Sequence, residues 1–241
     1  MLRVSQNLSE RIDALRNRMA MAARSAGRSV DCVTLLAVSK GQPAESVRAA
    51  ATAGLTDIGE SYLGEAVGKI TALGDLPLTW HFIGRLQSNK TREVAEHFAW
   101  VHGLDRLKIA ERLAAQRPYH APALNVCIQV NLAGEQSKGG VPVGEVPALV
   151  AAVAALPRLA LRGLMCIPPE ETDPERQRQW FARLRALRDS LNGGGFSLDT
   201  LSMGMSGDFE AAIQQGATIV RVGTAIFGPR PATAPRTIAE P

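Results

Sequence analysis

The chain has 241 residues, of which 46% are hydrophobic and 21% are charged, and its formal net charge is +4. This composition is typical of a globular protein with a hydrophobic core. A length near 240 fits either two small domains or one (β/α)8 barrel, a fold of about 250 residues, and we expect no room for a barrel followed by a second sizeable domain.

The positive charge does not indicate a nucleic-acid partner, because the basic residues are spread along the chain. The densest group lies in residues 176–188, where five arginines are set among Trp180, Phe181, Leu184 and Leu187 at helical spacing. This pattern predicts the solvated face of an amphipathic helix. Only 3 Trp, 2 Tyr and 6 Phe are available to stack on bases, so we expect no nucleic-acid binding.

The cysteines and the apolar runs predict a cytoplasmic protein. Cys32, Cys127 and Cys166 are odd in number and unpaired in spacing, which is typical of reduced thiols. Cys166 either lines a site or is a small buried hydrophobe, and the second interpretation is the simpler one. The N-terminus resembles no signal peptide and no apolar run reaches the roughly 18 residues that span a bilayer, so we expect no membrane partner.

The first predicted element is a helix. Leu8, Ile12, Leu15 and Met19 recur at the period of an amphipathic helix, and Gly27 is a typical C-terminal stop.

From Val33 onward, short strand-like runs alternate with stretches long enough for helices. The predicted strands are residues 33–40, 56–60, 79–85, 100–105, 124–132, 159–167, 200–206 and 218–227. Eight strand–helix units of this kind favour a single parallel (β/α)8 TIM-type barrel, an α/β fold. The competing open doubly wound sheet needs a glycine-rich turn after the first strand, and residues 41–45 do not form one.

The end of the chain explains why a barrel begins with a helix. After the eighth predicted strand, residues 228–241 contain four prolines and cannot make a covering helix. We therefore expect the N-terminal helix to cover the seam between the last and first strands, with residues 1–228 as one domain and residues 229–241 as a proline-rich tail.

Lys40 ends the first predicted strand, at the end of the barrel where active sites lie. A lysine after an apolar run is costly to bury unless it is paired, neutral or covalently used. Two interpretations remain open at this position: a lysine that extends to solvent at the rim, or an amine that attacks a carbonyl to form a Schiff base.

The seventh and eighth strands end in residues that suit an anion. Residues 202–207 include Met203, Ser206 and Gly207, and the eighth strand contains Gly223 and Thr224. Glycines let backbone N–H groups approach a ligand, hydroxyls donate hydrogen bonds, and loops after strands 7 and 8 commonly bind phosphate in barrels. We interpret them together as a phosphate cradle, although each run alone is more typical of a tight turn.

Barrel closure predicts that Lys40 lies roughly 5 to 10 Å from this cradle, one or two strand spacings away. A ligand with an aldehyde and a phosphate would satisfy both, and pyridoxal 5′-phosphate (PLP) has that shape. Arg221 lies two residues before Gly223, so both point to one face. Arg221 either meets the pyridine nitrogen and makes the ring a weak electron sink, or pairs with a carboxylate at the rim.

Other polar residues follow the strand ends. His81 is interpreted as a hydrogen-bonded interior histidine, since no second His or Cys stands at metal spacing and we expect no metal. Ser61 follows Glu60 at the end of the second strand. Lys138, in a glycine-flanked loop, is a second amine near the rim.

Seven segments together resemble the pyridoxal phosphate homeostasis protein family, which is related to the N-terminal barrel of alanine racemases. These segments are AVSK at 37–40, IGESYLGEA at 58–66, WHFIGRLQSNK at 80–90, VNLAGEQSKGG at 130–140, LRGLM at 161–165, LSMGMSGDFEAAI at 201–213 and RVGTAIFG at 221–228. The resemblance spans nearly the whole chain from Val33 to Gly228.

The resemblance implies a PLP-binding barrel that buffers or delivers the cofactor, without a known catalysed reaction. Lys40 would form the Schiff base, Arg221 would lie beside the ring nitrogen, and Ser206, Gly223 and Thr224 would hold the phosphate. We also assign Ser61, Met203, Gly207 and Lys138 to the cofactor site. PLP-dependent apo-enzymes are the expected protein partners, and we expect a monomer.

Two positions depart from the family pattern. Gln42 stands where the family often has a second lysine, and Ser61 stands where it usually has asparagine. A racemase remains the alternative function, although racemisation needs an acid–base group on each face of the substrate, and in alanine racemases a C-terminal domain supplies one of them. A metal or sugar-phosphate enzyme would explain the cradle but leave Lys40 without a role.

Overall fold

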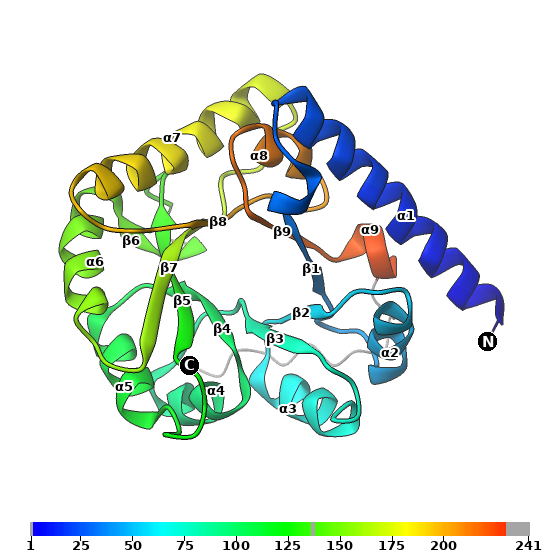
Figure 1. Ribbon diagram of the computed structural model, residues 1–241, viewed down its shortest axis with the longest axis horizontal. Helices are drawn as coiled ribbons and strands as arrows, with labels where there is room; N and C mark the ends of the chain where they lie inside the picture. Colours follow the sequence, from blue (N-terminus) through cyan, green and yellow to red (C-terminus); the bar gives the residue numbers. More distant parts are fainter. Residues whose placement is uncertain (1, 136–137, 230–241) are drawn as a thin grey trace.

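A computed structural model describes residues 2–135 and 138–229. Its strands are β1 (Thr34–Val38), β2 (Asp57–Glu60), β3 (Thr79–Phe82), β4 (Trp100–Leu104), β5 (Leu124–Asn131), β6 (Val141–Pro142), β7 (Leu159–Cys166), β8 (Thr200–Ser202) and β9 (Ile219–Val222). The strands are parallel in the order β4-β3-β2-β1-β9-β8-β7-β5, and the pairing of β4 with β5 closes the ring (Figure 1). The predicted eight-stranded barrel is confirmed.

The helices lie outside this ring (Figure 1). They are α1 (Leu2–Ser25), α2 (Ala44–Thr52), α3 (Leu63–Ala72), α4 (Thr91–His97), α5 (Leu107–Gln116), α6 (Val146–Ala154), α7 (Pro174–Gly193), α8 (Phe209–Gln214) and α9 (Thr224–Phe227). In α7, Phe181 and Leu184 are buried whereas Arg176 and Arg183 are exposed, which confirms the predicted amphipathic helix. No helix in the described part of the chain is long and apolar enough to cross a membrane.

Helix α1 covers the seam between the last and first strands, as predicted, because it packs on α8, α9 and α2. Leu8, Ile12, Leu15 and Met19 are all buried on its inner face. Gly27 takes a positive φ of 65° just beyond the helix, which favours glycine.

Arg28 ties the end of this segment to the barrel. Its guanidinium donates hydrogen bonds of 2.5 Å to Ile213 O and 2.8 Å to Ala217 O, at the end of α8 and just beyond it. The N-terminal helix is therefore held by apolar burial along its length and by polar contacts after its last turn.

The last two barrel strands are shorter than predicted. The segment predicted as strand 200–206 leaves the sheet after Ser202, and the segment 218–227 does so after Val222. The residues after Gly223 form α9, since the N–H groups of Ile226 and Phe227 both donate to Gly223 O at 2.9 Å. A short apolar run has the same sequence pattern in a strand and in a helical turn. The pattern of apolar residues therefore does not show where these two strands end.

A two-residue strand, β6, was not predicted. It pairs in parallel with the last two residues of β5, Val130 with Val141 and Asn131 with Pro142. Gly139 and Gly140 have φ values of 65° and 101°, and this left-handed backbone turns the loop back onto β5. Of the predicted tail, residues 229–241, all but residue 229 lies outside the described residues.

Candidate functional site

Lys40 follows β1 at the C-terminal end of the barrel, where the sequence placed it. It is half-buried, and a turn closes beside it because Gln42 N donates to Ser39 O at 2.9 Å. β1 pairs with β2 on one side and with β9 on the other. Lys40 therefore lies between the ends of the second and the last barrel strands.

A buried ionic cluster supports the backbone next to Lys40. Lys69 on α3 donates to Ser39 O at 2.7 Å, to Glu60 Oε1 at 2.6 Å and to Glu65 Oε1 at 2.5 Å. The hydroxyl of Ser39 also donates to Glu60 Oε1, at 2.5 Å. This cluster fixes the last residue before the candidate nucleophile.

The carboxyl of Glu60 is fully buried, and its Oε2 atom has no hydrogen-bond partner among the described residues. Burial raises the pKa of Glu60 above its usual range, although the Lys69 ammonium opposes this shift. Sequence reasoning placed Glu60 at a strand end without a role, and it missed Lys69 because a lysine on an outer helix is usually solvated.

The loop after β9 lies directly against the end of β1. A Cβ atom added to Gly223 would meet Val38 O at 3.1 Å, two residues before Lys40. Gly223 is half-buried and Thr224 is exposed. The structure therefore brings the end of β1, two residues before Lys40, against one half of the predicted phosphate cradle.

The other half of the cradle is the loop from β8 to α8. Ser206 is half-buried and Gly207 is exposed, and the carboxylate of Asp208 accepts a 2.5 Å hydrogen bond from Met205 N. This loop is joined to β9, because Arg221 N donates to Gly204 O at 2.9 Å. The loop after β8 and the end of β9 are thus neighbours.

Met203 and Ser61 lie at the edges of this region. The side chain of Met203 is completely buried in the hydrophobic core, so it exposes no surface to a ligand here. Ser61 is half-buried after β2, and its backbone abuts Gly84, where an added Cβ would lie only 2.3 Å from Ser61 O. The position of Ser61 is therefore set by backbone packing.

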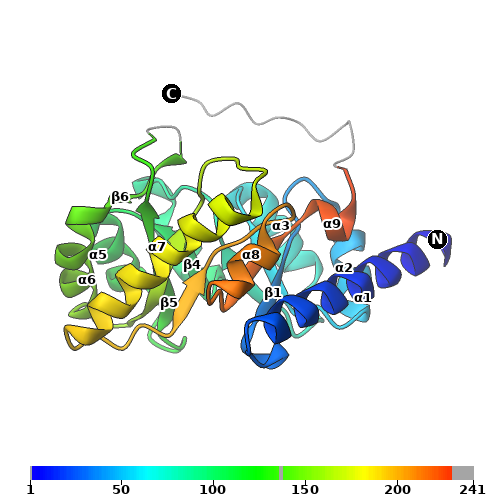
Figure 2. The ribbon, with the colours of Figure 1, turned by 90° about the horizontal axis from the view of Figure 1, so that it is seen from above.

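Lys138 lies at the same end of the barrel, on the loop between β5 and β6. Its ammonium donates to Pro168 O at 2.7 Å and lies 3.4 Å from a carboxylate oxygen of Glu135. Its own carbonyl accepts a 2.7 Å bond from Gln129. Figure 2 shows β6 and α9 at the same edge of the barrel, so this second amine and the cradle share one end.

Arg221 lies inside the barrel with only 5% of its surface exposed. Its guanidinium donates to Ser202 O at 2.7 Å, to Ser202 Oγ at 2.9 Å and to Cys166 O at 2.9 Å. These acceptors are two carbonyls and a hydroxyl, so the alternative of a rim ion pair with a carboxylate is wrong. Cys166 is a buried free thiol, as the simpler interpretation had it, and burial raises its pKa to about 12.

His81 is an interior histidine, as predicted. Its Nδ1 lies 3.0 Å from His102 Nε2, and its Nε2 lies 3.0 Å from Asp57 Oδ1. The described residues contain no cluster of three or more His, Cys, Asp or Glu side chains that would hold a metal ion.

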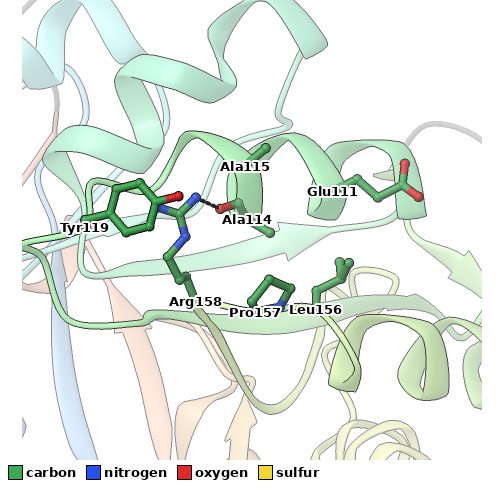
Figure 3. Close-up of a pocket in the computed structure, with 7 residues that line it drawn as sticks. All are labelled: Glu111, Ala114, Ala115, Tyr119, Leu156, Pro157 and Arg158. Carbon is green, nitrogen blue, oxygen red and sulfur yellow. Dashed lines mark hydrogen bonds between the residues drawn. The ribbon is translucent and has the colours of Figure 1, made fainter.

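A surface pocket of about 400 Å³ lies between α5 and the connection from α6 to β7 (Figure 3). Arg158, just before β7, donates to Ala114 O and stacks on Tyr119, its guanidinium carbon 4.4 Å from the ring centre. Since Arg158 precedes its strand and Lys40 follows one, this pocket lies at the opposite end of the barrel from Lys40.

The sequence model of the family described as alanine racemase, N-terminal domain, matches residues 11–231. The chain is 58% identical over 228 residues to the pyridoxal phosphate homeostasis protein of Pseudomonas aeruginosa, covering 95% of this chain and 98% of the relative. It is 49% identical over 230 residues to the protein of that name in Escherichia coli, covering 94% and 97%.

Two solved structures are similar to the barrel. PipY of Synechococcus elongatus with PLP bound is 36% identical, with a TM-score of 0.82 over 92% of this chain and 100% of PipY. An alanine racemase of Clostridium difficile is 13% identical, with a TM-score of 0.72 over 95% of this chain and 58% of the racemase, which is a likeness of fold alone. The chain belongs to the pyridoxal phosphate homeostasis protein family, within the wider family of the alanine racemase N-terminal domain.

Proposed function

We propose that the protein binds PLP on Lys40 and works as a carrier in the homeostasis of this cofactor. The observation that carries the proposal is the position of Lys40 beside the glycine loop after β9, since a Cβ at Gly223 would meet Val38 O at 3.1 Å. The names of the relatives and the PLP-bound structure of PipY support it.

The residues at this end of the barrel fit the cofactor. PLP supplies an aldehyde that condenses with a lysine amine, together with a ring and a phosphate. Lys40 offers the amine, and Ser206, Gly207, Gly223 and Thr224 offer backbone N–H groups and hydroxyls for the phosphate.

Four further residues complete the proposed site. Arg221, inside the barrel, would interact with the ring nitrogen, and Ser61, at the end of β2, would lie beside the ring. Lys138 is a second amine at the rim. Met203 supports the backbone of the cradle from the core rather than touching the cofactor.

We infer a carrier rather than a racemase. Racemisation needs an acid–base group on each face of the reacting carbon. Of the 2 tyrosines in the chain, Tyr119 lies at the opposite end of the barrel from Lys40, and Tyr62 is half-exposed at the start of α3. We further propose that the protein is a cytoplasmic monomer that passes PLP to apo-enzymes, and the free thiols of the three cysteines agree with a reducing compartment.

The absorption spectrum of the purified protein tests PLP binding. We expect a yellow protein whose borohydride-reduced adduct maps to Lys40, and a colourless Lys40→Ala variant. Lys108→Ala, at an exposed position of α5, is the matched control, and Lys138→Ala separates the two amines at this end of the barrel. A wild-type protein that never takes up PLP would refute the proposal, and an adduct on Lys138 would reassign the amine.

Exchange of the α-hydrogen of L-alanine in deuterium oxide separates carrier from racemase. A carrier is expected to give no exchange above the rate of free PLP. Exchange at an enzymatic rate that Tyr62→Phe abolishes would favour the racemase instead.

A further inference from the structure

Five side chains form a continuous hydrogen-bonded chain across the barrel interior. Asp57 Oδ1 lies 3.0 Å from His81 Nε2, and His81 Nδ1 lies 3.0 Å from His102 Nε2. His102 Nδ1 lies 2.7 Å from Ser202 Oγ, which accepts a 2.9 Å bond from Arg221. These residues come from β2, β3, β4, β8 and β9, so the chain reaches across the barrel.

The chain is closed to solvent along almost its whole length. His102 and Ser202 are fully buried, His81 is 1% exposed and Arg221 is 5% exposed. Only the side chain of Asp57 reaches solvent, with 28% of its surface exposed. Asp57 is the first residue of β2, so its carboxylate enters the chain from the end of the barrel opposite Lys40.

The two ends of the chain determine the direction of every hydrogen bond in it. An arginine only donates and a carboxylate only accepts. A neutral His81 therefore donates from Nε2 to Asp57 and accepts at Nδ1 from Nε2 of His102. A neutral His102 then accepts at Nδ1 the single proton of Ser202 Oγ, which itself accepts from Arg221. Both imidazoles carry their proton on Nε2.

Protonating either imidazole breaks this order. A cationic His102 would donate from Nδ1 to Ser202 Oγ, and the serine hydroxyl would then lose its acceptor inside a dry core. The electrostatics agree, since burial, the neighbouring His81 and the positive charge of Arg221 all lower the pKa of His102 well below its usual value. Burial also lowers the pKa of His81, against the opposing effect of Asp57.

Other groups complete the surroundings of the chain. Trp100 stacks on His81, with ring centres 5.5 Å apart and planes 6° from parallel. The ionisable groups that act on Arg221 are Cys166, Asp208 and Cys127. The thiols are neutral because burial raises the pKa of each to about 12. Asp208, in the loop between β8 and α8, is the carboxyl among these groups.

We propose that His81, His102 and Ser202 are positioning residues that hold Arg221 against the ring of the bound cofactor, with Asp57 as the distant acceptor that orders them. Three of the five guanidinium N–H groups of Arg221 are accounted for by Ser202 and Cys166, which leaves two that could donate to the ring nitrogen of the cofactor. The contact with the ring rests on the proposed function, whereas the ordered chain is a property of the protein without ligand.

Nitrogen-15 spectra of the histidines in the PLP-free protein test the ordered chain. At pH 7 we expect His81 and His102 to be neutral with the proton on Nε2, and assignment follows from His102→Gln. The other 2 of the 4 histidines, His97 and His120, are exposed and serve as internal references. A proton on Nδ1 of either buried ring, or a cationic ring, would overturn the proposal.

The Asp57→Asn variant tests whether the carboxylate sets the direction. Asparagine has the shape of aspartate, but its side chain either donates through the amide NH2 group or accepts through the amide oxygen. We therefore expect His81 and His102 to give a mixture of both tautomers. Asp75→Asn is the matched control, because Asp75 is a surface carboxylate paired with Arg48 and is 58% exposed. Unchanged tautomers in Asp57→Asn would remove Asp57 from the chain.

PLP binding then tests the positioning role. Ser202→Ala removes a hydrogen bond from the Arg221 cation, so we expect PLP affinity to fall about tenfold and the absorption maximum of the bound cofactor to shift. Ser202→Thr restores the hydroxyl and should restore both. Unchanged affinity and absorption in Ser202→Ala would overturn the positioning role. If wild type binds no PLP, the proposed function fails while the nitrogen-15 spectra still decide the ordered chain.

Discussion

His102 has no contact with solvent, and its buried neutral ring makes the stability of the protein depend on pH. In the unfolded chain a histidine binds a proton near pH 6.5, whereas the folded His102, with its pKa well below that value, does not. The unfolded state therefore binds more protons as the pH falls below about 6.5, and the free energy of unfolding decreases.

The His102→Gln variant measures this effect. Between pH 7.5 and 5.5 a histidine that stays neutral in the folded protein lowers the free energy of unfolding by at most about 1.4 kcal/mol. His81, whose pKa burial also lowers, adds to the wild-type loss. We expect urea unfolding to show a decrease in wild type that is larger than in His102→Gln by up to that amount, even though the variant is less stable throughout. His120→Gln, at an exposed position, should keep the wild-type slope. Equal slopes for wild type and His102→Gln would show that His102 binds protons as readily in the folded protein as in the unfolded chain.

Individual residues of the site differ in whether the sequence alone predicts them. Lys40 was identifiable because an amine after an apolar strand is an unusual arrangement in a local stretch of sequence. The cluster of Glu60, Glu65 and Lys69 was not, because Lys69 belongs to an outer helix and reaches Ser39 only through the tertiary fold, 30 positions away.

Among the elements, α1 is the one whose role depends most on packing. The barrel repeat provides a helix after each strand, and in the described residues after β9, which end at residue 229, this helix is the four-residue α9. The apolar face of α1 packs on α8 and α9 and covers the seam there. The stability of α1 should therefore come from burial of that apolar face rather than from the intrinsic helix propensity of its residues.

Two substitutions on α1 test this. Ile12 is fully buried and Met21 is 70% exposed on the same helix. We expect Ile12→Ala to lower the free energy of unfolding by about 2 to 5 kcal/mol, and Met21→Ala to change it by less than about 0.5 kcal/mol. Urea denaturation measures both values. Equal small losses would mean that the barrel closes without α1.

The barrel as a whole depends on close backbone contacts between neighbouring strands. Gly163 on β7 pairs with Cys127 on one side and with Thr200 on the other. A Cβ added to Gly163 would lie 1.8 Å from Thr200 O, which is backbone and has no flexible side chain to move. Only glycine allows β7 and β8 to approach at this point.

We therefore expect Gly163→Ala to force β7 and β8 apart and to cost at least about 3 kcal/mol, the upper end of ordinary overpacking. The matched control is Gly144→Ala, since an added Cβ there meets nothing within 4 Å. Urea denaturation and near-UV circular dichroism compare the two variants. Wild-type stability in Gly163→Ala would show that the strand spacing adapts freely.

The sequence by itself determined the class of fold, the amine at the end of the first strand and the glycine-rich strand ends. Each of these follows from a local pattern in the sequence. The patterns are the alternation of strand-like and helical runs, a lysine directly after an apolar run, and turn residues at the ends of strands. Tertiary structure decided the rest. The chain from Asp57 to Arg221 joins five strands, and its bond between His102 and Ser202 links residues 100 positions apart. The spacing of apolar residues along the sequence does not predict such a contact, because the contact forms only when the barrel closes.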